Sequence, residues 1–258
     1  MANIVYVLTG GNRGIGLGIV KKLLARPATT VVASVRNEAA AATLTTDAAS
    51  IDNGDGSNLH IMILDFSVAV APLAIRKAFT AATAGTIDRV DVLIANASMV
   101  SPLTPSITTT AEDLRTSFEV NTISPLLTFQ GLWPFMDKPR SAGESPPKFI
   151  AITSCVGSIE CLEPVPGGAY GPSKAALNWI TKSLHLQHKD SGLVSVAIHP
   201  GWVQTDAGRF SAKSWGYEPG PPDTIEDSVD GILKVIDKAT RETASGKFLT
   251  QTGQLFPW

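Results

Sequence analysis

The sequence predicts one α/β domain over residues 1–258, built on a doubly wound parallel sheet with helices on both faces. Short apolar runs alternate with helical patterns along the chain, as expected when parallel strands are joined by helical crossovers. A glycine-rich turn joins the first apolar run to the first helical pattern. With 258 residues and 44% hydrophobic content, the chain can bury one large core. No internal repeat or linker divides it.

The first element is a buried strand over Ile4–Leu8, and a helical pattern ending near Pro27 follows the turn Thr9–Gly16. Glycines permit a tight turn and a close backbone approach, and the free N–H groups at a helix N-terminus attract a pyrophosphate. The glycine spacing is G-x-x-x-G-x-G instead of the common G-x-G-x-x-G. The turn therefore predicts a Rossmann-type dinucleotide site. Its expected contacts are Gly10, Asn12, Arg13, Gly14, Ile15 and Gly16.

The second strand, Thr30–Ser34, indicates which dinucleotide is bound. A domain that binds NAD usually carries an acidic residue at the end of this strand, which holds the ribose 2′-hydroxyl. Here the strand leads into Val35, Arg36 and Asn37, and Arg36 can form paired hydrogen bonds with a 2′-phosphate. Arg13 can approach the same phosphate from the glycine turn. Two arginines and no acid predict NADP(H), with Arg36 and Asn37 at the site.

Polar residues follow the later strands at the edge where parallel strands end. Asp65 closes a strand over 61–64, Asn96 follows Val92–Ala95, Ser154 ends a strand over 149–153, and His199 follows a strand over 194–198. Ligands of doubly wound sheets bind in the crevice at this edge. The segment 206–222 leaves it without helical periodicity, which favours a lid, with an inert surface loop as the alternative. An N-cap pattern at Thr224 predicts a helix beyond it.

Tyr170 and Lys174 lie four residues apart at the start of a helix expected from about residue 169. This spacing places both side chains on one helix face. A free tyrosine titrates near ~10, and a fixed cation beside it favours the phenolate, which makes the phenol useful in proton transfer. The pair alone is a weak signal, because an exposed pair on a helix would look the same. The glycine turn upstream gives the pair its weight.

Together these motifs resemble those of the short-chain dehydrogenase/reductase family over nearly the whole chain. The family usually has Asn-Ala-Gly where this chain has Asn96-Ala97-Ser98, and His199–Thr205 matches a further family segment. Within the family, the chain is most similar to fungal NADPH-dependent reductases of the norsolorinic acid ketoreductase kind. The segments that support this narrower likeness are Val35–Asn37, Ala95–Ala97, His199–Asp206 and Ser245–Trp258.

The resemblance implies that Asn121, Ser154, Tyr170 and Lys174 form the catalytic set. Tyr170 would donate a proton to a carbonyl oxygen, Ser154 would hydrogen-bond that oxygen, and Asn121 would hold a water in the proton path. Lys174 would lower the pKa of Tyr170 and bind the nicotinamide ribose. Further cofactor contacts would come from Asp65 and Phe66 at the adenine, Asn96 and Ala97 at the adenosine ribose, and Pro200, Val203 and Thr205 at the nicotinamide.

The expected function is reduction of a ketone on a bulky aromatic or polycyclic substrate of a secondary-metabolite kind. Aromatic residues lie in or beside the expected lid, and a long segment over 155–169 would form the facing wall, with Leu162, Glu163 and Val165 shaping the pocket. The aromatic residues are Trp202, Phe210, Trp215 and Tyr217. Alternatively, they pack against the core or a neighbouring subunit. Other functions left open are imine reduction, cyclase or pericyclase activity, and an NADPH-binding sensor without turnover.

Composition limits the partners. A net charge of −2 provides no electrostatic footprint for nucleic acid or an anionic membrane. No apolar run approaches the roughly 20 residues of a membrane span, so we expect a cytoplasmic protein. Cys155, Cys161 and the four histidines lack metal-ligand spacing, so no metal is expected. Cys155 is either a small buried residue or a reactive thiol. The resemblance implies a homodimer or homotetramer.

Overall fold

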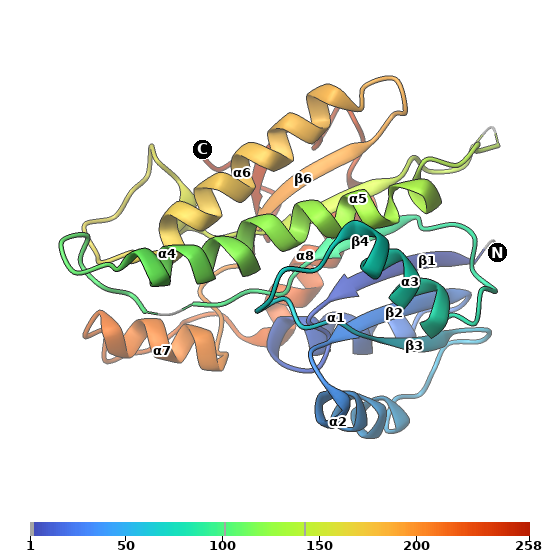
Figure 1. Ribbon diagram of the computed structural model, residues 1–258, viewed down its shortest axis with the longest axis horizontal. Helices are drawn as coiled ribbons and strands as arrows, with labels where there is room; N and C mark the ends of the chain where they lie inside the picture. The colour runs from blue at the N-terminus through green and yellow to red at the C-terminus, as the bar shows by residue number, and fades with distance from the viewer. Residues whose placement is uncertain (1–2, 101, 142) are drawn as a thin grey trace.

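The computed structural model describes residues 3–100, 102–141 and 143–258, in which a seven-stranded parallel sheet lies between two layers of helices (Figure 1). The strand order is β3-β2-β1-β4-β5-β6-β7. The strands are β1 (Ile4–Thr9), β2 (Thr29–Val35), β3 (Asn58–Ile63), β4 (Val92–Ala95), β5 (Lys148–Ile152), β6 (Val194–His199) and β7 (Phe248–Thr250). The chain reverses its direction of winding between β1 and β4, where such sheets form their binding crevice. This is the doubly wound fold that the sequence predicts.

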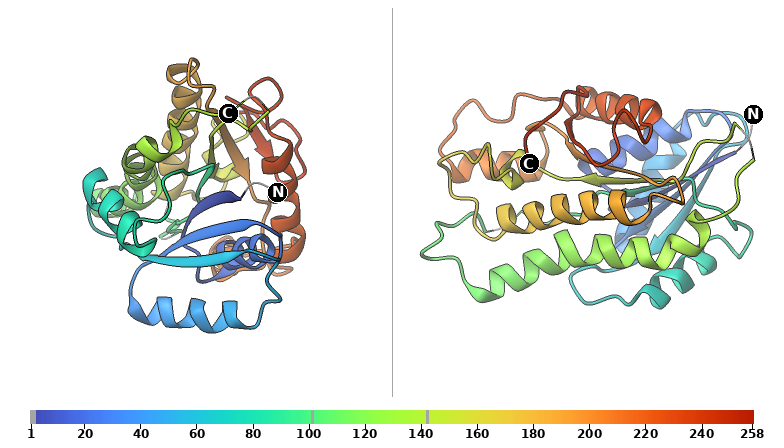
Figure 2. Two further views of the ribbon diagram at one scale, coloured as in Figure 1. Left: turned by 90° about the vertical axis from the view of Figure 1, so that its right-hand side faces the viewer. Right: turned by 90° about the horizontal axis from the view of Figure 1, so that it is seen from above.

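The helices divide between the two faces of the sheet (Figure 2). They are α1 (Gly14–Leu24), α2 (Glu38–Ala49), α3 (Pro72–Ala82), α4 (Ala111–Phe118), α5 (Ser124–Met136), α6 (Tyr170–Gln187), α7 (Asp206–Ser214) and α8 (Ile225–Lys238). One face is covered by α1, α2 and α8, and the other by α3, α5 and α6. A π-helical turn, η1 (Glu119–Ile123), joins α4 to α5, and a 3₁₀ turn, η2 (Cys155–Gly157), follows β5.

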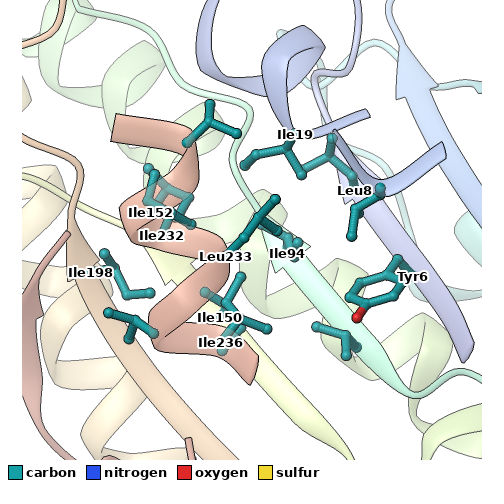
Figure 3. Packing of buried hydrophobic residues seen from close by; sticks show 14 of the residues in the cluster. Tyr6, Leu8, Ile19, Ile94, Ile150, Ile152, Ile198, Ile232, Leu233 and Ile236 are labelled. Atoms are coloured by element: carbon teal, nitrogen blue, oxygen red, sulfur yellow. The ribbon is translucent and has the colours of Figure 1, made fainter. Parts of the chain in front are cut away.

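The core explains why the strands are apolar along their whole length. Because side chains alternate across a strand, Tyr6 and Leu8 of β1 pack on one face of the sheet, while Val5 and Val7 pack on the other. Val7 lies between Val32 of β2 and Leu93 of β4. Figure 3 shows the first face, where isoleucines of β4, β5 and β6 meet the apolar side of α8. Because helices cover both faces of the sheet, the side chains of β1 are apolar on both faces and do not alternate between apolar and polar residues.

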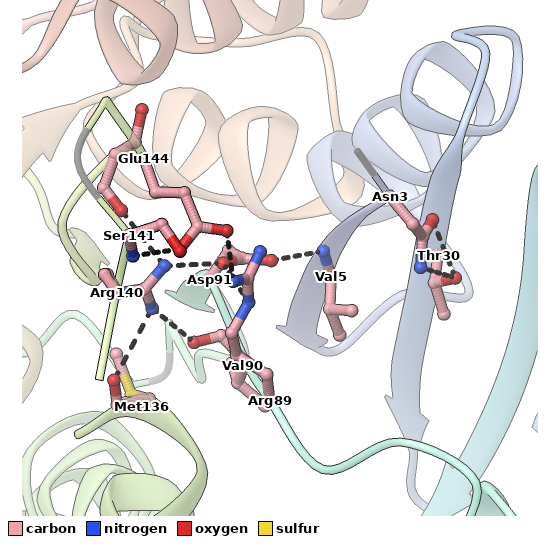
Figure 4. Close-up of polar contacts among 11 residues, drawn as sticks. Asn3, Val5, Thr30, Arg89, Val90, Asp91, Met136, Arg140, Ser141 and Glu144 are labelled. Carbon is pink, nitrogen blue, oxygen red and sulfur yellow. Dashed lines mark hydrogen bonds and ion pairs between the residues drawn. The ribbon is translucent and has the colours of Figure 1, made fainter. Parts of the chain in front are cut away.

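A buried carboxylate ties the amino ends of β1 and β4 together (Figure 4). Asp91 Oδ2 accepts a hydrogen bond from Val5 N at 2.9 Å, and Oδ1 pairs with Arg140 at 2.7 Å. Arg89 lies 3.1 Å from Asp91 and 2.7 Å from Glu144. Two guanidinium groups thus compensate a carboxylate that burial would otherwise disfavour. This cluster anchors the edge of the sheet opposite the carboxyl ends of the strands.

Two differences from the predicted elements affect residues near the carboxyl ends of the strands. Strand β3 ends at Ile63, so Asp65 lies beyond the strand instead of closing it. The segment expected to be irregular contains helix α7, whose first turn is capped because Thr205 Oγ1 accepts a hydrogen bond from Gly208 N at 3.1 Å. The helix predicted after Thr224 is confirmed as α8. Across the described ranges, no helix has both the length and the hydropathy needed to cross a membrane.

Candidate active site

A cavity of about 800 Å³ opens at the carboxyl ends of β1, β4, β5 and β6. It is lined by nearly all of the predicted site residues: Gly10, Asn12, Arg13, Gly14, Ile15, Gly16, Arg36, Asp65, Phe66, Asn96, Ala97, Ser154, Tyr170, Lys174, Pro200, Val203 and Thr205. Asn37 and Asn121 are the predicted residues that do not line it. The fold therefore brings segments from the whole chain to one place.

The glycine turn fits an anionic ligand. Gly10 has a φ of +73°, and a Cβ atom there would lie 3.1 Å from Ala97 Cα. A Cβ atom on Gly16 would collide with the carbonyl oxygen of Gly10. Arg13 occupies the N-cap of α1 without a side-chain cap, and the first turn contains no acidic residue. The N–H groups and positive dipole end of α1 therefore face the cavity, which suits a pyrophosphate.

Beside this turn, the end of β2 provides the cation expected for a 2′-phosphate. Arg36 lines the cavity, and Arg13 Nη1 lies 3.9 Å from Asp206, with both side chains strongly exposed. A contact of this kind is weak and leaves Arg13 available. Hydrogen bonds from the side chain and backbone of Ser67 lower the pKa of Asp65, and the charge of Arg36 adds a smaller lowering. The cavity thus has a charged end.

Asn37 is a correction to the predicted contacts. Its Oδ1 accepts a hydrogen bond from Ala40 N at 2.9 Å, so the side chain caps helix α2 instead of facing the cavity. Asparagine is a preferred N-cap residue, which explains its presence after β2 without any ligand. Asn37 was predicted to contact the cofactor because it directly follows Arg36 in the sequence. Only the direction of its side chain separates the two roles.

Asn96 fastens the end of β4 to the glycine turn. Its Nδ2 donates to Thr9 O at 3.0 Å and to Gly10 O at 3.1 Å. Thr9 Oγ1 in turn accepts hydrogen bonds from the backbone N–H groups of Asn96 and Ala97, both at 3.0 Å. With both amide hydrogens occupied, Oδ1 is the atom of the Asn96 side chain that remains to accept from a ribose hydroxyl. The residue therefore supports the turn as well as lining the cavity.

The three polar side chains of the predicted chemistry lie together where β5 meets α6. Tyr170 is the first residue of α6, and Ser154 precedes η2 at the end of β5. Lys174 Nζ donates to Ile152 O at 2.9 Å and lies 5.7 Å from the centroid of the Tyr170 ring. Ser154 Oγ accepts a hydrogen bond from Val156 N at 3.2 Å, and Ser154 lines the same cavity as Tyr170. The helical spacing and the strand end therefore converge as predicted.

Burial controls the protonation of this group. Burial raises the pKa of Tyr170 to about 12, while hydrogen bonds with Ser154 and Ser98 act in the opposite direction. Burial also lowers the pKa of Lys174 to about 7. The expected lowering of the Tyr170 pKa by Lys174 is therefore not seen, because desolvation disfavours the charged form of both groups. The phenol keeps its proton at neutral pH, as a proton donor must.

Asn121 lies in η1, behind the cavity wall. Its Oδ1 accepts from Ser98 Oγ at 3.1 Å and from Met99 N at 2.8 Å. Its Nδ2 donates to Met99 O at 2.9 Å and to Ser173 Oγ at 3.0 Å. Protein atoms thus occupy both hydrogens and both lone pairs of the side-chain amide. The side chain therefore holds the loop after β4 against α6, and the water that the resemblance implied at Asn121 stays a prediction.

The turn after β6 is held by hydrogen bonds to His199 and Asp223. His199 Nδ1 accepts a hydrogen bond from Cys155 N at 3.3 Å, and burial lowers the pKa of His199 to about 4. Asp223 Oδ2 accepts from Trp202 N at 2.7 Å. The first bond joins the ends of β5 and β6 beside Ser154. His199 begins a segment that resembles the family in sequence, but its hydrogen bond and its neutral state come from the structure. Asp223 stands in no motif, so only its contact identifies it.

The lid predicted over 206–222 borders the cavity and contacts the facing wall. Trp215 Nε1 donates to Pro166 O at 2.9 Å, which links the lid to the segment between Ser154 and Tyr170. The ring of Trp202 lies 5.8 Å from that of Trp215 and 4.9 Å from that of Tyr217. All three rings line the cavity, and so do Leu162, Glu163 and Val165. Phe210 lies in the lid on α7, as predicted, but it is exposed and does not line the cavity.

Cys155 shares this wall. Its side chain is half-buried and lines the cavity, and burial raises the pKa of the thiol. A raised pKa reduces the thiolate fraction and hence the reactivity of the sulfur. The structure therefore favours a packing role for Cys155 over a reactive thiol.

Comparison with known proteins agrees with this geometry. Residues 4–214 match the family model described as short chain dehydrogenase. The chain is 37% identical to a short-chain dehydrogenase of Pyricularia oryzae, covering 98% of this chain and 97% of that protein. It is 35% identical to a norsolorinic acid ketoreductase of Dothistroma septosporum, covering 98% of this chain and 92% of that protein. The chain therefore belongs to the short-chain dehydrogenase/reductase family and is an oxidoreductase.

A solved structure extends the likeness to three dimensions. The NADPH-bound carbonyl reductase from chicken fatty liver superimposes with a TM-score of 0.83 at 31% identity, and the match covers 100% of both chains. The fold is thus shared along the whole chain.

Proposed function

We propose that this protein is an NADPH-dependent reductase that converts the ketone of a bulky aromatic or polycyclic substrate into an alcohol. The observation that carries the proposal is a single cavity with two different ends. Arg13 and Arg36 border one end, while Tyr170 and Ser154 lie beside the aromatic lid at the other. The related ketoreductase and the NADPH-bound carbonyl reductase support the reaction class and the cofactor NADP(H).

The residues present fit this cofactor. The N-terminus of α1 would hold the pyrophosphate, Arg13 and Arg36 the 2′-phosphate, and Lys174 the nicotinamide ribose. The bound nicotinamide supplies the hydride. A preference for NADP(H) over NAD(H) follows from the arginines and from the absence of an acidic residue at the end of β2.

Tyr170 provides the proton for the reduction. Its phenolic O–H bond breaks as the carbonyl oxygen gains charge, and the proton passes to that oxygen. The raised pKa of Tyr170 keeps the proton in place until it is needed. Ser154 donates a hydrogen bond to the same carbonyl oxygen and stabilises the developing negative charge. The phenolate that remains is short-lived because its pKa is high, so it readily takes up a proton.

The lid supports the substrate class. Three aromatic rings gather on one wall, and their flat faces suit a planar aromatic substrate. Leu162 and Val165 make the opposite wall apolar, and Glu163 is the acidic side chain between them. This combination favours a neutral polycyclic ketone over a small aliphatic one.

The test measures NADPH consumption with a small aliphatic ketone and a bicyclic aryl ketone of similar reactivity. Wild type should prefer the aryl ketone by at least about tenfold in kcat/KM, since burying a few more carbon atoms contributes this much. A variant with residues 209–217 replaced by a short Gly/Ser linker should lose most of that preference. Phe210→Ala is the matched control, because this ring lies on the lid but outside the cavity.

The result separates the alternatives as well. A wild type that prefers the aliphatic ketone, or a linker variant that keeps the aryl preference, contradicts the substrate class. Imines in the same panel reveal imine reduction if they react faster than both ketones. Loss of substrate without NADPH consumption points to a cyclase, and no turnover of any compound points to a sensor.

A further inference from the structure

One carboxylate, Asp223, joins the turn after β6 to the far end of the lid. The turn, Pro200–Thr205, is the segment predicted to flank the nicotinamide, and the lid over 206–222 begins directly after it. Asp223 directly follows the lid and forms a parallel β-bridge with Val203 of the turn. The two ends of the lid therefore lie side by side. The proposed mechanism assigns no role to this carboxylate.

Three hydrogen bonds fasten the turn to Asp223. Asp223 Oδ2 accepts from Trp202 N at 2.7 Å, Asp223 N donates to Trp202 O at 3.0 Å, and Asp223 O accepts from Gln204 N at 2.9 Å. The first of these has a carboxylate acceptor, and such bonds are roughly twice as strong as those between neutral groups. The turn also packs tightly on the carboxylate, because a Cβ atom on Gly201 would collide with Asp223 Oδ2.

Trp202 extends this connection into the lid. Its indole Nε1 lies 3.2 Å from Gly208 O and 3.0 Å from Ser211 Oγ, and it donates to both of these acceptors on α7. The backbone of Trp202 thus belongs to the turn, while its side chain holds the lid helix. A displacement of the turn therefore displaces the lid as well.

Thr205 provides a second link, which is more local. It is predicted to contact the nicotinamide, and its Oγ1 also accepts a hydrogen bond from Gly208 N at 3.1 Å. This bond spans three residues and caps only the first turn of α7. Asp223 holds the other end of the lid, so the two links can be separated by experiment.

We propose that Asp223 is a positioning residue that couples NADPH binding to the position of the lid. NADPH fixes the turn when the nicotinamide packs against it, and Asp223 and Trp202 then fix the lid beside the substrate end of the cavity. Such coupling is reciprocal, so a fixed lid also strengthens NADPH binding. The inference rests on the proposed function, because it requires NADPH at this turn.

Limited trypsin digestion measures the coupling, because Arg209 and Lys213 are exposed cleavage sites on α7. Cleavage within a helix requires local opening, so a fixed lid is cut slowly. In wild type, saturating NADPH should slow cleavage at these two sites at least about tenfold, as mass spectrometry of the fragments would show. In Asp223→Ala most of this protection should be lost, and NADPH should bind about tenfold more weakly, equivalent to ~1.4 kcal/mol. Asp223→Asn should keep most of both, since its Oδ1 can accept from Trp202 N.

A second variant and a control accompany this pair. Trp202→Phe keeps a ring and the backbone bond to Asp223 but removes the indole donor, so protection should fall with a smaller loss of NADPH affinity. Asp227→Ala is the matched control, because this acid lies four residues beyond Asp223 and accepts from Thr224 Oγ1 at 2.6 Å. It weakens the start of α8 without contacting the turn, so protection by NADPH should remain.

The outcomes that overturn the inference are distinct. Protection that persists in Asp223→Ala would assign the coupling to Thr205, and equal losses in Asp223→Asn and Asp223→Ala would contradict the role of the hydrogen-bond acceptor. Wild-type protection in Trp202→Phe would also overturn the inference, whether or not Asp223→Ala folds. A wild type that binds NADPH without protecting the lid refutes this inference alone, whereas a wild type that does not bind NADPH refutes the proposed function.

Discussion

His199 should make the stability of this protein fall in mild acid, and His199→Asn should remove that fall. Burial lowers the pKa of His199 from 6.5 to about 4, so the unfolded chain takes up a proton at a higher pH than the folded one. Stability is therefore fully present above pH ~6.5 and is lost as pH falls toward ~4. Asparagine cannot titrate, and its Oδ1 can replace Nδ1 as the acceptor for Cys155 N.

The size of the effect follows from the two pKa values. The difference between 6.5 and about 4, at ~1.4 kcal/mol for each unit, sets an upper limit of about 3 kcal/mol. Because the ring borders the open cavity and pH ~5 lies above the folded-state pKa, we expect about 2 kcal/mol between pH ~7.5 and ~5. Urea unfolding of both proteins at several pH values measures it, and common titrating groups cancel in the difference. A difference in unfolding free energy that stays constant from pH ~7.5 to ~5 would refute the reasoning.

Three further variants test the proposed chemistry and cofactor. Tyr170→Phe keeps the ring and removes the proton, so reduction should fall roughly 10²–10⁴-fold with NADPH affinity nearly intact, as stopped-flow and fluorescence titration would show. Lys174→Ala should reduce both activity and NADPH affinity, and intact binding would exclude the lysine from the ribose site. Wild type should bind NADPH at least about tenfold more tightly than NADH, and Arg36→Ala should reduce that ratio. Equal affinities in wild type, or an unchanged ratio in the variant, would contradict the role of Arg36.

Sequence patterns correctly predicted those parts of the site whose geometry is set by residues close together in the sequence. The pair Tyr170 and Lys174 share a helix face because a helix turn spans about four residues, wherever the helix lies. Gly10 and Gly16 mark a turn that a side chain would block, and this requirement is visible in the sequence. Apolar runs predicted the central strands because both faces of the sheet are covered.

Side-chain direction and burial depend on contacts between distant segments, so only the tertiary structure decided them. Asn37 caps a helix although its neighbour Arg36 lines the cavity, and Asn121 uses its whole amide within the protein. Desolvation, which no local pattern measures, raises the pKa of Tyr170 although Lys174 lies nearby. The hydrogen bond from Cys155 to His199 joins the turn after β5 to β6, between residues 44 apart in the sequence.

The sequence by itself determined which elements form and which residues they carry to the edge of the sheet, because these follow from local periodicity. The packing of those elements decided what each side chain does there.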